Sequence, residues 1–493
     1  MLNTIDLVVL VGYLAIVVGL GFWFARTSGQ TDEFMAAGHS LPGWAIGLSM
    51  FGSYISSISF LANPGKAYEG NWNPFVFSLA TPIAAAIAVR WFVPFYRRQG
   101  EISAYEHLEH RFGRWARTYA VICFLLTQVA RMATVFYLLA LAVAPLTSWR
   151  VESTILLTGT LITVYTLCGG IRAVVWVGVL QSMVLLAGPI ICILVLLSKT
   201  PGGLAGIIET GAAHGKFNLG SFGTSLAEPT FWVVFIYGLV INVGNFAVDQ
   251  SYVQRYMTAR SDREAAKGVW ITALLYVPVA GVFFFIGTAL FVFYSAQPEL
   301  LGAVSKADLV FPRFIATQLP VGCAGLVVAA IFAASMDSNL NSMATLTLCD
   351  IYKRYLRPSA GERESMNVLR LSTFGWGAIC TGAALAMTQV ASVLDAWWEL
   401  AGIFSGGMLG LFILGMISRA GNAAATCAVL IGVLVIVWMS LSPTKNWPES
   451  LSHLSNPMHS FMTTVVGTLT ILLVGLFLST GSKRVMKVET HTK

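Results

Sequence analysis

Long, uninterrupted apolar segments recur along the whole chain, and they limit its fold more than any other feature. One of them contains the run from Ala428 to Val435, and a helix needs roughly 20 such residues to cross a bilayer. Only 11% of the residues are charged, whereas soluble proteins have about 25%. A membrane barrel would instead alternate apolar and polar residues in segments of about ten. The sequence therefore predicts an all-α, polytopic membrane protein rather than a soluble globule.

Thirteen segments have the length and composition of membrane spans. They cover approximately residues 5–25, 42–64, 73–96, 118–146, 152–168, 173–198, 229–250, 269–295, 320–347, 369–390, 396–417, 421–441 and 460–480. The first segment has neither a basic leader nor a cleavage site, so we expect a retained helix and no signal peptide. Because no soluble segment interrupts the series, we expect residues 1–493 to form a single transmembrane domain.

Lysine and arginine are divided unequally between the two sides that thirteen crossings define. With the C-terminus in the cytoplasm, the inner segments carry 21 of the 30 basic residues, the outer segments carry 7, and two lie within spans. The excess of cytoplasmic basic residues in membrane proteins then places the N-terminus outside. The same bias explains the net charge of +7, so we expect no nucleic-acid partner. The cysteines form no CxxC pair and predict no disulfide or metal site.

Two spans carry residues that interrupt a helix. The stretch Ser53–Gly65 holds four serines and ends in a Pro-Gly pair, and Gly238–Gln250 contains Asn242, Gly244 and Asn245. A broken helix frees carbonyl groups that can bind a cation, whereas serines bonded back to the preceding turn would be only structural. The two stretches lie five spans apart. Paired interruptions of this kind indicate a transporter built from two inverted repeats, with its site near the middle of the bilayer.

Arg131 lies within a span, 14 residues after Arg117 and therefore roughly 21 Å deeper along a helix. A charge at that depth costs about 2.5–3.5 kcal/mol on the insertion scale, and no acidic residue lies one turn away in the sequence. Two interpretations stay open. The guanidinium could pair with Asp249 or Asp337 from another helix, or it could hold a substrate carboxylate with its planar donors.

The stretch from Ala333 to Ser342 is the most polar part of an otherwise apolar span. On a helix, Ala334, Asp337 and Ser338 share one face and offer a carbonyl, a carboxylate and a hydroxyl, which suit a hard cation. A polar seam between helices is the alternative. Motifs for nucleotide hydrolysis, nucleophilic catalysis and zinc binding are missing from the sequence. We therefore expect transport driven by an ion gradient and no enzymatic activity.

In these polar segments the chain resembles the sodium:solute symporter family over nearly its whole length, and within the family it looks most like bacterial sialic acid symporters. The resemblance is carried by Ser103–Phe112, Gly169–Trp176, Asp249–Tyr256, Leu340–Thr345 and Asp350–Tyr352. It implies a leucine-transporter-type 5+5 inverted repeat, with one extra N-terminal helix and two C-terminal helices. The repeats would cover about 42–198 and 229–417, in a bacterial inner membrane.

The resemblance also implies site residues. The substrate pocket would contain Arg131, which would hold the sugar carboxylate, together with Tyr54, Ser56, Ser59, Ser78 and Asn242. Sodium, the implied cofactor, would be bound by the carbonyl groups of Gly52, Ile55 and Ala334 and by the side chains of Asp337 and Ser338.

The chain departs from the family pattern at two places that affect the ions. The ninth span reads about three residues short, which nearly preserves the helix face but shifts its depth by about 4.5 Å, so that Asp337 and Ser338 replace the usual pair of hydroxyls. Gly178 stands where members with a second sodium site carry an acidic residue, so we expect that second ion to be absent. Pro74 and Ser78 replace larger or amide-bearing pocket residues.

The leading expectation is therefore symport of a small carboxylate-bearing solute, best matched by sialic acid, with sodium. Two alternatives within transport stay open: symport of another sugar or organic acid, and proton coupling through Asp337, whose carboxyl group could carry a proton in a low dielectric. An alternative of another class is a membrane sensor. A sensor would need a long soluble extension at the C-terminus, which we do not expect here.

Overall fold

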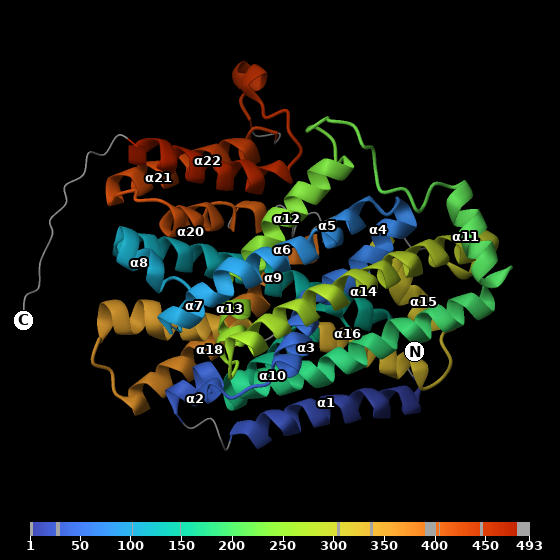
Figure 1. Ribbon diagram of the computed structural model, residues 1–493. Coiled ribbons are helices and arrows are strands. Elements are labelled where there is room, and N and C mark those ends of the chain that lie inside the picture. Colours follow the sequence, from blue (N-terminus) through green and yellow to red (C-terminus); the bar gives the residue numbers. More distant parts are fainter. Residues whose placement is uncertain are drawn as a thin grey trace, which may run out of the picture.

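The computed structural model describes residues 3–25, 30–100, 102–147, 149–302, 306–335, 339–389, 401–403, 405–443 and 447–480. The long helices of these segments run side by side in one bundle (Figure 1). No strand occurs in these ranges, and their only sheet-like contact is an isolated parallel bridge between Leu41 and Ala259.

The helices fall into a first and a second half of the chain. The first half contains α1 (Thr4–Ala25), α2 (Thr31–Ala36), η1 (Ala37–His39), α3 (Gly43–Tyr54), η2 (Ile58–Ala62), α4 (Asn63–Glu69), η3 (Asn73–Phe75), α5 (Val76–Leu79), α6 (Thr81–Ile87), η4 (Ala88–Phe92), α7 (Val93–Gln99), α8 (Glu106–Phe112), α9 (Arg114–Thr147), α10 (Val151–Lys199) and α11 (Gly203–Ala213). The second half contains α12 (Phe231–Ala247), α13 (Gln250–Met257), α14 (Asp262–Ala296), η5 (Pro298–Leu300), η6 (Ala307–Leu309), α15 (Val310–Gln318), α16 (Cys323–Ser335), α17 (Asn339–Leu346), η7 (Thr347–Leu356), α18 (Glu362–Ala386), η8 (Met387–Gln389), α20 (Met408–Ile417), α21 (Asn422–Leu441), η9 (Glu449–Leu454) and α22 (Met462–Thr480).

Nine helices of the described chain are long and apolar enough to cross a membrane, and two bent helix pairs bring the number to 11. Two shorter apolar helices, Val151–Val164 and Ala401–Ile417, add to these. Together they overlap every one of the thirteen segments that the sequence predicts. The prediction of an all-α membrane protein is confirmed, while the number of crossings stays a prediction.

The two bent pairs lie where the sequence predicts broken spans. The helices Gly43–Tyr54 and Ile58–Glu69 meet at 57°, and Phe231–Ala247 and Gln250–Met257 meet at 46°. In the first pair the backbone of Ile55 is extended, with φ −95° and ψ 92°. The break therefore precedes the Pro-Gly pair. The π-helical turn η2 comes directly before α4, and it accommodates Pro64, which has no amide hydrogen, without a second break.

The predicted fifth and sixth spans form one continuous element, α10, with a kink at Gly170. This residue has φ 55° and ψ −166°, and a Cβ atom on it would lie 2.9 Å from the Cα atom of Phe34. Glycine is required here for both reasons, because other residues rarely adopt a positive φ and no space exists for a side chain. The kink separates the shorter helix Val151–Val164 from the span Gly170–Lys199.

Helices α10 and α18 pack through the same pattern of small residues. A Cβ atom on Gly159 would lie 2.1 Å from Oγ1 of Thr381, and a Cβ atom on Gly377 would lie 2.1 Å from Oγ1 of Thr163. Each helix thus has a glycine followed four residues later by a threonine, and the threonine of each helix packs against the glycine of the other. The first part of α10, Val151–Val164, is the fourth span of the first predicted repeat, and α18 is the fourth span of the second.

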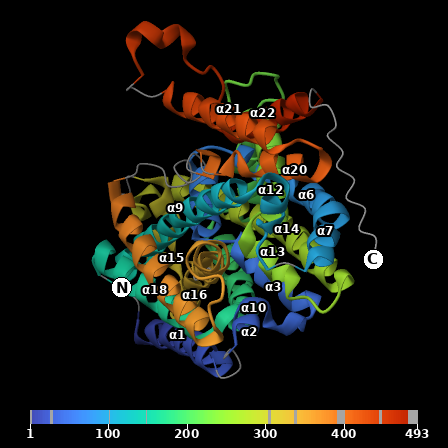
Figure 2. The ribbon, with the colours of Figure 1, turned by 90° about the vertical axis from the view of Figure 1, so that its left-hand side faces the viewer.

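Helix α1 and the pair α21–α22 lie at opposite edges of the bundle in both views (Figures 1 and 2). Helix α1 begins at the end of the bundle where α11 and α15 lie, whereas α22 ends toward the opposite end, the one that carries α8 (Figure 1). These added helices therefore flank the core that contains the two bent pairs. Helix α15 lies in the segment between the predicted spans 269–295 and 320–347.

Candidate functional site

A partly enclosed cavity lies where the first bent pair meets α9, α12 and α14. Its volume is about 90 Å³, whereas a single buried water needs only roughly 10–15 Å³. The lining includes five of the six residues predicted to bind substrate: Tyr54, Ser56, Ser59, Ser78 and Arg131. Further lining residues are Ile58, Asn63, Pro74, Phe77, Tyr237, Ile241, Asn245, Tyr252, Tyr276 and Ala401. The cavity therefore combines one guanidinium group with hydroxyl, amide and aromatic groups.

Arg131 lies midway along the 34-residue helix α9, and its residue surface is only 9% exposed. Its Nη2 atom donates a hydrogen bond to the carbonyl oxygen of Ser53, in the last turn of α3. Ser53 stands one residue before the end of α3. The broken helix thus anchors one nitrogen of the guanidinium, while the residue also lines the cavity.

Aromatic rings enclose the Tyr54 side of the cavity. The ring of Tyr54 lies 5.2 Å from that of Phe246, 5.1 Å from that of Tyr252 and 5.1 Å from that of Tyr276, measured between centroids. These contacts join α3 to the second bent pair and to α14. They give the cavity an apolar wall beside its hydroxyl and guanidinium groups, a combination typical of small-molecule sites.

The serines of the first break have different positions. Ser57 is fully buried, and its hydroxyl donates to the carbonyl oxygen of Val135 on α9, at 3.0 Å. Ser56 and Ser59 line the cavity instead. Ser57 therefore fixes the break against α9 and leaves its two neighbours at the cavity wall.

Asn242 lies outside the lining of the cavity. It is fully buried, and its amide group donates to the carbonyl oxygens of Gly238, at 2.7 Å, and Phe77, at 3.2 Å. Asn245, three residues later in the same interrupted stretch, lines the cavity in its place. The sequence signal found the correct segment, but the position in contact with the cavity is 245.

Two of the three backbone groups predicted to bind sodium lie at the first break. Gly52 lies in the last turn of α3 and Ile55 lies directly after it, where carbonyl groups lack helical partners. Ala334 is buried near the end of α16, a helix that contacts α3. The remaining predicted ligands, Asp337 and Ser338, lie outside the described residues. Carbonyl oxygens at such a break are ligands that suit a hard cation.

Close packing of α3 against α10 surrounds this region. A Cβ atom on Gly178 would lie 2.6 Å from Oγ and 3.1 Å from Cα of Ser49. On the same contact, a Cβ atom on Gly52 would lie 2.8 Å from Oγ of Ser182, whose hydroxyl donates to the carbonyl oxygen of Leu48 at 2.6 Å. Position 178, where an acidic ligand for a second ion would stand, therefore has no space for a side chain.

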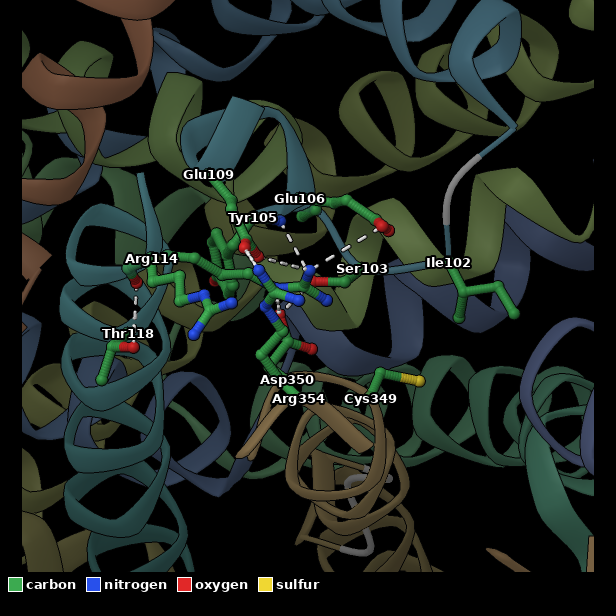
Figure 3. A network of polar contacts seen from close by, with 12 residues as sticks. Ile102, Ser103, Tyr105, Glu106, Glu109, Arg114, Thr118, Cys349, Asp350 and Arg354 are labelled. Atoms are coloured by element: carbon green, nitrogen blue, oxygen red, sulfur yellow. Dashed lines mark hydrogen bonds and ion pairs between the residues drawn. The ribbon is translucent and has the colours of Figure 1, made fainter. Parts of the chain in front are cut away.

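A second polar network lies at the end of the bundle that carries α8. Glu109 and Asp350 bind basic side chains and Ser103 there, and these contacts join α8, α9, η7 and the loop before α8 (Figure 3). Gln250, at the start of α13, accepts from the amide of Ala104 at 2.8 Å and donates to the carbonyl oxygen of Ile102 at 2.9 Å. Three of the sequence segments that carry the family resemblance thus meet at one place.

Comparison with known proteins gives consistent results. A sequence model of the sodium:solute symporter family matches residues 34–432. The sodium/sialic acid symporter SiaT of Proteus mirabilis is 33% identical over 96% of this chain and 94% of its own length. The sodium/sialic acid symporter NanT of Aliivibrio fischeri is also 33% identical, over 96% and 92% of the two chains. The human sodium/iodide cotransporter is 29% identical over 88% of this chain and 69% of its own.

Solved structures agree with the helix arrangement. A sodium-coupled sialic acid symporter in a substrate-bound, outward-open state superimposes with a TM-score of 0.89 at 30% identity, covering 98% of each chain. The nucleobase–cation symporter Mhp1 superimposes with a TM-score of 0.57 at 16% identity, over 90% of this chain and 93% of its own, and shares only the fold. The predicted leucine-transporter-type fold is confirmed.

Proposed function

We propose that this chain, which belongs to the sodium:solute symporter family, imports sialic acid together with sodium by alternating access. The observation that carries the proposal is the partly enclosed cavity at the break of α3, into which Arg131 brings a fixed positive charge. Relatives that cover nearly the whole chain and are named for sodium and sialic acid support it. A chain of this kind moves its substrate unchanged, and we propose that it is not an enzyme.

The cavity offers groups that match the parts of an acidic sugar. Arg131 holds the carboxylate through charge-assisted hydrogen bonds, which are about twice as strong as neutral ones. Ser56, Ser59, Ser78 and Asn245 provide hydroxyl and amide groups for the sugar hydroxyls. Tyr54 packs against the apolar face of the ring.

Sodium binds between the first break and the polar segment that follows α16. The ligands are the carbonyl oxygens of Gly52, Ile55 and Ala334 and the side chains of Asp337 and Ser338. A cation there favours the conformation in which α3 and α16 stay together, and substrate binds that conformation more tightly. Sodium can shift this equilibrium only by its own difference in affinity for the two conformations.

The protein lies in a bacterial inner membrane with its N-terminus outside and its C-terminus in the cytoplasm. The excess of basic residues in the predicted inner segments supports this orientation. Basic residues such as Arg97, Arg111 and Arg354 stand on α7, α8 and η7, and Arg354 belongs to the network of Figure 3. That network then faces the cytoplasm, and the repeats cover about 42–198 and 229–417.

Uptake by purified protein in proteoliposomes tests the function. We expect radiolabelled N-acetylneuraminate to accumulate with an inward sodium gradient, and not with choline in its place. Lactate, which lacks the sugar ring, and glucose, which lacks the carboxylate, serve as control solutes. Accumulation of lactate alone, or uptake that needs a pH gradient instead of sodium, would contradict the proposal.

A further inference from the structure

A buried lysine joins the loop after α11 to the first bent helix pair. Lys216 is only 6% exposed, although its neighbours Gly215 and Asn218 are exposed. Its Nζ atom donates hydrogen bonds to the carbonyl oxygens of Tyr68, at 2.6 Å, and Gly70, at 3.0 Å. Lysine is almost never fully buried unless its charge is paired. The two carbonyl oxygens therefore account for an ammonium group that points inward from an exposed loop.

These two carbonyl groups belong to the end of α4. Tyr68 lies in the last turn of this helix, and Gly70 directly follows its last residue, Glu69. The last four carbonyl groups of a helix lack intrahelical partners, and a positive charge beside them interacts favourably with the helix dipole. Lys216 therefore caps the second half of the first bent pair from a position 148 residues after Tyr68.

Phe291 on α14 adds a third contact to the ammonium group. The centroid of its ring lies 3.9 Å from Nζ of Lys216, within the range of a cation–π interaction. Burial lowers the pKa of Lys216, and the negative charge of Glu69 opposes this shift. Helices α4 and α11 lie at the same end of the bundle (Figure 1). Lys216 thus joins the loop, the end of α4 and α14 at one point.

The residues after α4 continue this connection. The amide of Trp72 donates to the carbonyl oxygen of Lys216 at 3.1 Å, and its indole Nε1 atom donates to Oγ1 of Thr288 on α14 at 2.9 Å. Nδ2 of Asn73 donates to the carbonyl oxygen of Leu219 at 3.0 Å. The chain from the last turn of α4 to Asn73 is therefore bound to the loop on one side and to α14 on the other.

The segment that follows directly reaches the substrate cavity. Pro74, Phe77 and Ser78 line this cavity, and they stand on η3 and on the four-residue helix α5. A helix of one turn has too few internal hydrogen bonds to fix its own position. The position of this wall therefore depends on its neighbours. One neighbour is α12, from which Asn242 donates to the carbonyl oxygen of Phe77, and the other is the connection at residues 68–73.

We propose that Lys216 is a positioning residue for the substrate cavity. It holds residues 68–73 between the loop and α14, and thereby fixes the cavity wall that Pro74, Phe77 and Ser78 form. This inference rests on the proposed function, because substrate affinity is the property that the position of this wall determines. A residue outside the lining of the cavity then controls how tightly the cavity binds.

Hydrogen exchange on the purified full-length protein tests the positioning without substrate. Lys216→Met has a side chain of similar length but removes the donors and the charge. We expect amide exchange in residues 71–79 to become at least fivefold faster in this variant, while exchange in α16 is unchanged. Lys199→Met is the matched control. Lys199 also donates to a backbone carbonyl oxygen, that of Gln318 at 2.8 Å, but this exposed bond joins α10 to α15.

Substrate affinity gives a second readout. At a temperature well below its melting transition, Lys216→Met should raise the N-acetylneuraminate Kd in saturating sodium at least fivefold. Lys216→Arg should bring the Kd to within about twofold of the wild type, because a guanidinium group can also donate to both carbonyl oxygens and stack on Phe291. A lower melting temperature of Lys216→Met with an unchanged Kd would show that Lys216 only stabilises the fold, and would overturn the proposal.

Thr288→Val provides an independent variant if Lys216→Met does not fold. It preserves the side-chain shape but removes the acceptor of the Trp72 indole, so exchange in residues 71–79 should again be faster and the Kd higher. Wild-type exchange and affinity in the folded variants would equally overturn the proposal. A wild-type protein that binds no N-acetylneuraminate contradicts the proposed function, whereas the exchange rates of residues 71–79 still decide whether Lys216 fixes this segment.

Discussion

At the level of single residues, the proposed recognition of a charged substrate depends on Arg131. One of its nitrogens is committed to the carbonyl oxygen of Ser53, so the remaining edge of the planar guanidinium is held in a defined direction. A lysine at this position would supply a charge but only one nitrogen, which cannot bind the carbonyl group and a carboxylate with the same geometry. The proposed recognition of a substrate carboxylate therefore requires the guanidinium and not merely a positive charge.

Replacing Arg131 with lysine is expected to weaken N-acetylneuraminate binding by about 10- to 150-fold, the value of a lost hydrogen bond between charged groups. Sodium-dependent thermal stabilisation should persist, because none of the proposed sodium ligands is changed. Calorimetric titration and a thermal melt measure the two quantities. Arg150→Lys, on an exposed side chain of the same type, is the control. Wild-type affinity in Arg131→Lys would remove Arg131 from the substrate site.

The two asparagines of the second break should separate binding from stability. Asn245→Ala is expected to lower substrate affinity at least fivefold with little change in the melting temperature, since Asn245 lines the cavity. Asn242→Ala loses one buried and one partly buried hydrogen bond to carbonyl groups and should cost about 1–3 kcal/mol of stability. The affinity of the Asn242→Ala protein that stays folded should be unchanged. A reversal of these effects would restore Asn242 to the pocket.

Five of the six residues predicted to bind substrate line one cavity, and the sequence singled them out because polar residues in an apolar span have few uses other than function. It could not choose between Asn242 and Asn245. Three residues along a helix change the direction of a side chain by only about 60°, and the deciding factor is which neighbouring helix each one faces. Tyr252 and Tyr276 gave no signal, because aromatic residues are common in membrane helices and their meeting with Tyr54 depends on the tertiary fold.

At the level of helices, the position of the first break shows what local sequence leaves open. The Pro-Gly pair at Pro64 marked the correct span, yet the helix breaks at Ile55. Proline has no amide hydrogen to donate, and a helix can accommodate this either by unwinding or by a π-helical turn. The turn η2, directly before α4, is of the second kind. The extended conformation of Ile55 instead depends on contacts with α9, including those of Ser57 and Arg131.

The contact between α3 and α10 supports a prediction about the ions. Gly178→Asp should not add a sodium ion to the transport cycle, because its side chain would collide with Ser49 and push α10 away from the first break. We expect a loss of stability of about 1–3 kcal/mol, typical of overpacking. Gly375→Ala on α18 is the control, since a Cβ atom there has open space. Charge-to-substrate ratios and thermal melts measure both effects, and one extra charge per cycle would refute the prediction.

At the level of the whole molecule, the two halves repeat one design. The repeat within each half begins with a bent pair, at 57° in the first and 46° in the second, and the fourth spans of the two repeats meet through matching glycine and threonine residues. The sequence revealed the repeat through its interrupted spans. The pairs Gly159–Thr163 and Gly377–Thr381 gave no such signal, because small residues at this spacing are frequent in membrane helices and only the fold brings these two together.

The coupling ion is a property of the whole molecule, and Asp337→Asn distinguishes the two candidates for it. An amide oxygen still coordinates sodium, but the lost charge weakens its attraction to the cation. If sodium is the coupling ion, the sodium concentration for half-maximal N-acetylneuraminate uptake should rise at least tenfold, and high sodium should restore part of the rate. If Asp337 carries a proton instead, the variant loses coupling at every sodium concentration. Uptake measured from 1 to 500 mM sodium, with Asn367→Asp on the exposed part of α18 as a control for surface charge, separates the outcomes. An unchanged sodium dependence in Asp337→Asn would exclude Asp337 from the sodium site.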